Sequence, residues 1–191
     1  MGCFRLLTNY CEDVWDKLRN NKWKSILTAL VCVIGIAFGA VLFNVFKYGW
    51  WFDNRVNYAE KLFQGGFALF FSFLLWTAAF YFCVLLSNLV PVTRFLNYVL
   101  LFVACFYCGA NTAATIYCWT VWGVLFAIFA TLWEVIGYYL ACIATCAEPA
   151  SCRKLNEAFC DFKPTLVVLI VAFVIKIVGF FVILKIITAI I

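Results

Sequence analysis

Two ionisable residues stand in the middle of apolar segments near the C-terminus. Glu134 lies 12 residues before Cys146, and Lys176 lies 12 residues after Pro164. At about 1.5 Å per helical residue, both side chains lie roughly 18 Å from the loop that joins the two segments. Opposite charges at equal depth on neighbouring helices can neutralise each other, so we predict that they form a buried pair.

A second set of polar groups interrupts the apolar segment 95–118. Asn111 and Thr115 are one helical turn apart. Polar groups are costly in lipid, so they should face protein or a wet cavity. Asn111, Thr115, Glu134 and Lys176 are therefore the candidate polar residues within the membrane.

The cysteines, 11 in all, are scattered along the chain. Cys105 and Cys108 form a CxxC pair, but inside an apolar segment, where packing is the favoured interpretation over redox chemistry. Spacings around the last polar loop match no zinc site, so we predict no metal. Cys3, Cys146 and Cys152 lie near predicted membrane boundaries and are candidates for lipidation.

No pattern of catalytic residues is present. The chain has no histidine, which removes the usual general base and most zinc and haem ligand sets. Its carboxylates are single, and no phosphate-binding loop, nucleophile elbow or zinc-protease motif occurs. We therefore expect no enzyme activity and no cofactor.

Composition points to a membrane protein. Apolar residues make up 68% of the chain and charged residues only 12%, with a mean hydropathy of +1.05. A soluble fold of this length could not bury so much apolar surface, so lipid must cover most of it. The formal net charge of +5 then reflects loops beside anionic lipid, and we expect no nucleic-acid binding.

The apolar segments predict an all-α membrane protein, a bundle of five transmembrane helices. In residues 1–24 the apolar side chains fall on one helical face and the polar side chains on the other. This pattern predicts an amphipathic helix in the cytoplasmic interface. Residues 25–191 form the transmembrane domain, with spans at 25–46, 67–90, 95–118, 123–145 and 164–191. The break between spans 3 and 4 is expected at residues 119–123; if these spans form one kinked element, the bundle has four spans.

Small residues mark two faces for close helix packing. Gly35 and Gly39 form a GxxxG pair in the first span, where another helix can approach. Cys105, Gly109 and Ala113 form a row of small residues in the third span. We expect both rows to contact other helices.

Lysine and arginine predict the orientation. With the N-terminus in the cytoplasm, nine of the 14 basic residues lie inside and three outside, and two lie in the last span. This asymmetry follows the positive-inside rule and gives an integral, multi-pass protein with its C-terminus outside.

Two functions remain open. The aromatic-rich apolar surface, the small-residue faces and the missing catalytic groups favour a non-catalytic scaffold or accessory subunit of a membrane complex. Its partners would be membrane lipids and either other membrane-protein subunits or further copies of itself. The alternative is a small oligomeric channel or transporter with Asn111, Glu134 and Lys176 near a polar path.

Overall fold

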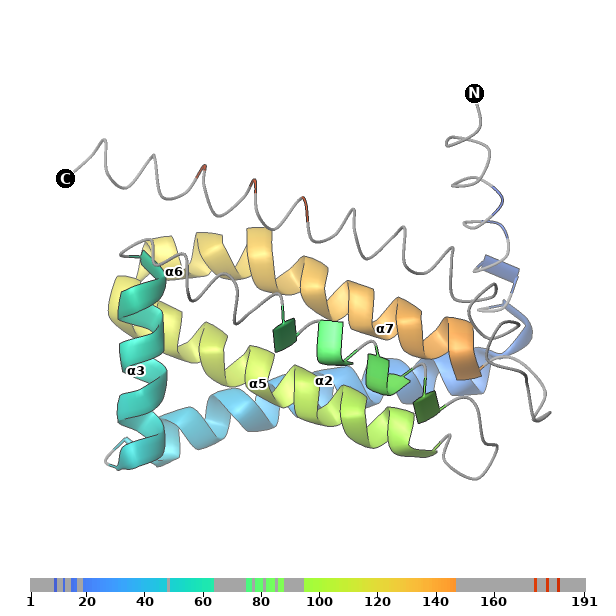
Figure 1. Ribbon diagram of the computed structural model, residues 1–191, viewed down its shortest axis with the longest axis horizontal. Helices are drawn as coiled ribbons and strands as arrows, with labels where there is room; N and C mark the ends of the chain where they lie inside the picture. The colour runs from blue at the N-terminus through green and yellow to red at the C-terminus, as the bar shows by residue number, and fades with distance from the viewer. Residues whose placement is uncertain are drawn as a thin grey trace.

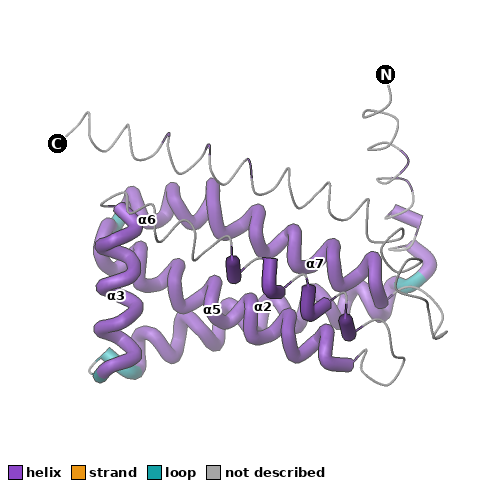
Figure 2. The backbone as a smooth tube through the Cα atoms, viewed as in Figure 1, coloured by secondary structure: helices purple, strands orange, loops and turns teal. Residues whose placement is uncertain are grey.

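Helices make up almost all of the computed structural model, and the part of the chain that it describes contains no strand. The described residues are 9, 12, 15, 16, 19–47, 49–63, 75, 76, 78–80, 82–84, 86, 87, 95–146, 174, 178 and 182. Most of the last predicted span and most of the predicted N-terminal interfacial helix lie outside them. Figure 2 shows helix along nearly all of the described chain, with short connections.

Two long apolar helices form the centre of the molecule. They are α2 (Lys22–Val45) and α5 (Leu96–Trp119), and each is long and apolar enough to cross a membrane. They cover the residues of the first and third predicted spans. Each has 24 residues, or about 36 Å of helix, against a hydrocarbon core of about 30 Å.

Helices α2 and α5 run in the same direction and touch through their backbones. A Cβ added at Gly39 would lie 2.1 Å from the carbonyl oxygen of Phe106, and one added at Gly109 would lie 2.2 Å from that of Ile36. At Gly35 the added atom would lie 2.9 Å from the Cβ of Cys105. Only glycine leaves room for this approach, which we call the α2–α5 seam.

A shorter helix, α3 (Trp50–Phe63), lies across the end of the bundle (Figure 1). Gly49 makes the turn into it with a φ of +146°, a backbone conformation that side chains disfavour. The inner face of α3 buries Phe52 and Ala59 against Phe43 of α2 and Ala114 of α5. Its polar outer face is exposed, with Asp53 in the first turn and Lys61 in the last, which suits the helix dipole.

After α5 the chain reverses at Thr120, inside the predicted break at 119–123. Thr120 has a φ of +47°, and Gly123 then packs against the backbone of Thr115. The returning helical stretch has three parts: α6 (Val121–Phe126), the π-helix η2 (Ala127–Thr131) and α7 (Leu132–Cys146). Residues 95–146 therefore form an antiparallel helical pair rather than one kinked element.

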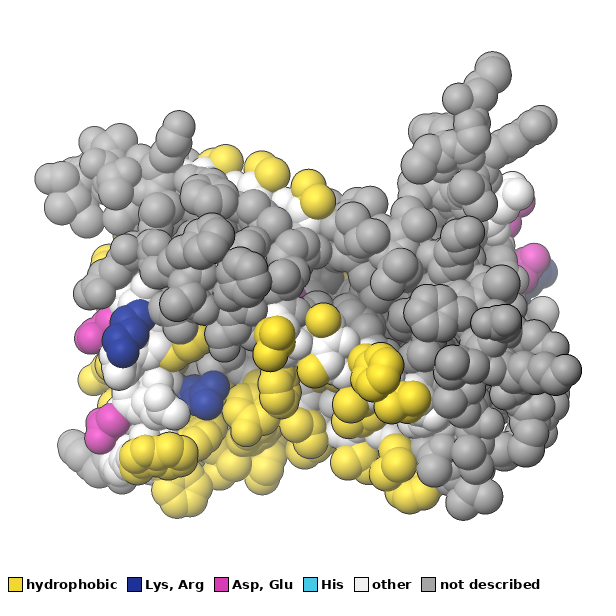
Figure 3. All heavy atoms as spheres, viewed as in Figure 1, with side chains coloured by type: hydrophobic (Ala, Val, Ile, Leu, Met, Phe, Trp, Pro, Cys, Tyr) yellow, Lys and Arg dark blue, Asp and Glu magenta, His cyan; other side chains and the backbone are white. Residues whose placement is uncertain are grey.

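The main core lies where α2, α5 and α7 meet Phe80 and Val84. It is closely packed around Tyr138, a fully buried residue whose ring lies 4.3 Å from that of Phe80. The buried residues that share this cluster are Cys32, Phe80, Val84, Leu101, Ala104, Cys105, Cys108, Tyr138 and Cys142. Large hydrophobic side chains also remain on the outside, and Figure 3 shows them spread over one face of the molecule.

The α2–α5 seam predicts which substitutions the bundle tolerates. Gly39→Ala places a methyl group against the backbone of Phe106, so it should lower the free energy of unfolding by on the order of 1–3 kcal/mol. Ala37→Leu is the matched control, because Ala37 lies on the exposed face of the same helix. Reversible unfolding of the purified protein in mixed micelles would measure both. Equal stability of Gly39→Ala and wild type would contradict the close approach.

Candidate polar site inside the helical bundle

An arginine from α3 reaches into the bundle and meets the predicted polar residue of α5. Arg55 donates a hydrogen bond from Nη1 to Oδ1 of Asn111 at 3.1 Å. Its guanidinium carbon lies 5.1 Å from the centre of the Tyr107 ring, within reach of a cation–π interaction. Asn111 thus has a charged partner on a neighbouring helix.

Arg55 was not among the predicted site residues, because it lies between two predicted spans, where a charged residue is expected. The signal was nevertheless present in the spacing of the inward-facing residues. Phe52, Arg55, Val56 and Ala59 recur at the spacing of one face of a helix. Arg55 lies on the stripe that packs against α2 and α5, so its side chain is directed inward.

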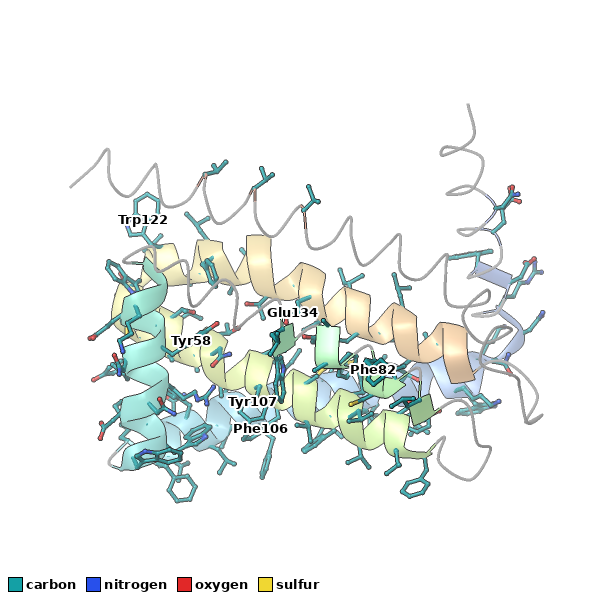
Figure 4. The ribbon with its side chains drawn as sticks, in the orientation of Figure 1. Tyr58, Phe82, Phe106, Tyr107, Trp122 and Glu134 are labelled. Atoms are coloured by element: carbon teal, nitrogen blue, oxygen red, sulfur yellow. The ribbon has the colours of Figure 1, made fainter. Side chains whose placement is uncertain are left out.

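Tyr58 is the second residue that α3 contributes. Burial raises the pKa of its hydroxyl above the ordinary value, and the negative charge of Glu134 adds to the increase, while Arg55 opposes it. The hydroxyl therefore stays protonated at neutral pH and can act as a hydrogen-bond donor. Figure 4 shows Tyr58 beside α3, with Tyr107 and Glu134 further toward the middle of the bundle.

Glu134 lies in the first turn of α7, directly after the π-helix. The Tyr138 hydroxyl, one turn later, donates a hydrogen bond to Oε1 of Glu134 at 2.5 Å. Its predicted partner, Lys176, lies outside the described residues. The described surroundings of Glu134 are thus Tyr138, held in the core, and Tyr58 with the nearby Arg55. We call Arg55, Tyr58, Tyr107, Asn111, Glu134 and Tyr138 the polar cluster.

Thr115 is not part of this cluster. It is almost fully buried, and its hydroxyl donates to the carbonyl oxygen of Thr112 at 2.8 Å in the same helix. Its backbone instead forms the contact with Gly123. Thr115 therefore stabilises the α5–α6 turn region and does not extend the site around Asn111.

The predicted packing residues fall into two places. Gly35, Gly39, Cys105 and Gly109 meet in the α2–α5 seam. Ala113 lies further along α5, half-buried beside the cluster that joins α2, α3 and α5. The row of small residues on α5 thus contacts first α2 and then the end of the bundle.

The cysteines of the predicted CxxC pair are both buried. Cys105 and Cys108 lie in the main core with Cys32 and Cys142. Among the described residues, no group of three or more Cys, Asp and Glu side chains could hold a metal ion. The candidate lipidation sites Cys3 and Cys152, and the side chain of Cys146, lie outside the described part.

Two further polar contacts tie helices together away from the polar cluster. The hydroxyls of Ser25 in α2 and Tyr139 in α7 are hydrogen-bonded at 2.7 Å. Asn97, fully buried at the start of α5, contacts the Ser87 hydroxyl through its side chain and the Cys142 thiol through its backbone carbonyl. Each contact joins residues from different parts of the chain, so buried polar groups are used to fix how the helices pack.

The Arg55–Asn111 bond predicts non-additive effects of mutation. Asn111→Leu should lower the free energy of unfolding by about 1–3 kcal/mol, because it leaves the part-buried guanidinium of Arg55 without its acceptor. The double variant Arg55→Leu/Asn111→Leu should recover part of this loss, since no charge remains buried. Asn44→Leu serves as the control, because Asn44 is exposed and its side chain donates to the Ala40 carbonyl of its own helix. Additive losses in chemical unfolding of the four proteins would show that the pair is not coupled.

Comparison with known proteins finds no match to these features. No family model, no curated protein and no solved structure matches the chain. The function is therefore inferred from the helices and from the contacts of the polar cluster.

Proposed function

We propose that the chain is a multi-pass integral membrane protein that acts as a non-catalytic scaffold or accessory subunit of a membrane complex. One observation carries the proposal: polar side chains on both long helices bond to partners on other helices, while the exposed faces of these helices are mostly apolar. Arg55 with Asn111 and Ser25 with Tyr139 show the first half. The exposed side chains of α2 show the second, among them Ile26, Leu30, Val33, Ile34, Phe38, Val41 and Val45.

The aromatic residues support a membrane placement. Trp23, at the start of α2, is 85% exposed, and Trp50, after its end, is 80% exposed. Tryptophan is enriched at the two interfaces of a bilayer, and α2 between them is about 36 Å long. Such an arrangement places apolar side chains against lipid and the polar face of α3 against water. Membrane lipids are thus the first proposed partners.

Five spans with a cytoplasmic N-terminus form the proposed topology. The parallel course of α2 and α5 supports it. Two helices that cross the membrane in the same direction need an odd number of spans between them, and the proposed topology places one span there. The antiparallel return from α5 to α7 adds the next crossing in the same scheme. The excess of basic residues on the N-terminal side supports the orientation.

The topology predicts that the two ends of the chain lie on opposite sides of the membrane. Epitope tags at both ends, in sealed right-side-out vesicles, should differ in their access to added protease. The C-terminal tag should be cut in intact vesicles and the N-terminal tag only after lysis. Two tags with the same protection would contradict five spans.

The scaffold proposal further predicts stable association with other chains. The apolar outer faces of α2 and α5 provide surface for other membrane-protein subunits or a second copy of this chain. Purification in a mild detergent, followed by identification of the retained proteins and determination of the mass of the particle, tests this directly. A monodisperse monomer with no retained subunit at native expression level would contradict the proposal.

A small channel or transporter is the second candidate function. The polar cluster favours it, because Arg55, Asn111 and Glu134 place ionisable and polar groups inside a bundle of membrane-length helices. The π-helix directly before Glu134 also favours this function, since such segments frequently lie at functional sites. An oligomer would be required to complete a continuous path.

Substitutions at Glu134 and Lys176 separate the two functions. Each single leucine substitution should lower the folded yield, because it leaves the other charge alone in the membrane, with a cost on the order of 3–5 kcal/mol. The double variant should recover much of the yield. A scaffold then keeps its partners in the double variant, whereas a transporter folds but loses solute flux in proteoliposomes. Equal yields for all three variants would remove the proposed pair.

A further inference from the structure

Two thiols meet across the α2–α5 seam. Cys32 of α2 and Cys105 of α5 share a hydrogen bond between their side chains. Both belong to the main core, where Cys32 is 5% exposed and Cys105 is fully buried. Neither is part of a disulfide in the structure, so the pair is present in its reduced form.

The backbones at this point are close enough for a covalent bond between the two sulfur atoms. Cys32, Gly35 and Gly39 lie on one buried stripe of α2. A Cβ added at Gly35, one turn after Cys32, would lie 2.9 Å from the Cβ of Cys105. A disulfide needs two Cα atoms within roughly 7 Å of each other. Because the thiols are already hydrogen-bonded, rotation about their Cα–Cβ bonds can bring the sulfur atoms to bonding distance.

The other core cysteines do not compete equally for this bond. The Cys142 thiol contacts the carbonyl oxygen of Asn97, and Cys108 lies in the same helix as Cys105. A metal ion fits the pair less well than a disulfide. Among the described residues no group of three or more Cys, Asp and Glu side chains could hold an ion. A disulfide is neutral, which suits an apolar core where a buried charge is costly.

We propose that Cys32 and Cys105 are a disulfide-forming pair that joins α2 covalently to α5 when a hydroperoxide enters the bundle. A hydroperoxide with an apolar chain dissolves in lipid, so it can reach thiols that water-soluble oxidants do not. The pair belongs to the seam itself, so the proposal applies whether the protein is a scaffold or a transporter.

The reaction takes two steps. The sulfur of Cys32, which retains some exposure, attacks the outer oxygen of the hydroperoxide and becomes a sulfenic acid. The O–O bond breaks, and the rest of the hydroperoxide leaves as an alcohol with the Cys32 thiol proton. The sulfur of Cys105 then attacks the sulfur of Cys32, and the hydroxyl group leaves as water with the Cys105 thiol proton. Two thiols are oxidised, and one hydroperoxide is reduced to an alcohol and water.

The new bond is expected to stabilise the bundle. It closes a loop over residues 33–104 and so restricts the unfolded chain, which is the main way in which a disulfide stabilises a protein. The oxidised protein should therefore unfold at a higher temperature than the reduced protein.

Peptide mapping without reductant tests the proposal on the full-length protein in its own membranes. The membranes are treated with cumene hydroperoxide, the remaining thiols are blocked with N-ethylmaleimide, and the digested protein is analysed by mass spectrometry. The peptide that links Cys32 to Cys105 should be at least about tenfold more abundant than any other cysteine pairing, because the two thiols already lie together. Dithiothreitol should remove it.

Isotope labelling distinguishes a bond within one chain from a bond between chains. Labelled and unlabelled copies of the protein are mixed in one set of vesicles before oxidation. Each linked peptide should be wholly labelled or wholly unlabelled, since the seam lies within a single chain.

Variants assign the bond to its two cysteines. Cys32→Ser and Cys105→Ser should each abolish the linked peptide and the increase in unfolding temperature on oxidation. Cys108→Ser is the matched control and should keep both, because Cys108 lies in the same core one turn further along α5. Cys83→Ser, at an exposed thiol, should also keep both. If a serine variant does not fold, the linked peptide of the wild type decides the outcome.

Four results would overturn the proposal. They are linkage of Cys32 or Cys105 mainly to another cysteine, linked peptides that combine labelled and unlabelled chains, a linked peptide that persists in Cys105→Ser, and oxidation of Cys83 with none at the pair. None of them bears on the scaffold function, which the identity of the copurified subunits tests separately.

Discussion

The contact between the backbones of α2 and α5 is the constraint on which the rest of the structure depends. Within a membrane, apolar side chains gain little by leaving lipid for one another, so helices associate through close packing and hydrogen bonds. Gly35, Gly39 and Gly109 allow that closeness over residues 35–39 of α2 and 102–110 of α5. The parallel register they impose determines which face of α5 is left for α3 and α7.

Polar contacts then position the remaining helices on this pair. Arg55 attaches α3 to α5, Tyr139 attaches α7 to α2, and Asn97 is contacted by both Ser87 and Cys142. A polar side chain finds few other partners in an apolar interior. Its hydrogen bond therefore selects one arrangement of the helices among many of similar packing energy. The polar cluster includes ionisable groups from both α3 and α7, Arg55 and Glu134 among them.

Much of the framework could be predicted from apolar length, glycine spacing and turn residues. The stretches that become α2 and α5 are mostly apolar, with no Asp, Glu, Lys or Arg over residues 25–45 and 96–119, and the reversal at Thr120 falls between two tryptophans and before a glycine. The small-residue rows of α2 and α5 lie at a helix contact, as their spacing predicts. The spacing alone does not predict that the two rows face each other. That pairing is a tertiary property, and neither row contains information about its partner.

Only part of the polar cluster could be predicted from the sequence. Asn111 and Glu134 stood out because they interrupt apolar segments, but Arg55 belongs to a polar stretch where a charge is unremarkable. Its role depends on the tilt of α3 across the bundle end, which follows from the Gly49 turn and from the packing of Phe52. The π-helix before Glu134 was also unpredictable, since its extra residue per turn rotates the face on which Glu134 lies relative to a regular helix.

Distance measurements in a lipid bilayer test the parallel α2–α5 pair most directly. Spin labels introduced in a cysteine-free background at Trp23 and Phe95, both exposed and at the starts of the two helices, should be close together by double electron–electron resonance. Labels at Trp23 and Thr120, at opposite ends, should be farther apart by most of a helix length of about 36 Å. The reverse order of the two distances would contradict the parallel seam and, with it, the arrangement of the polar cluster.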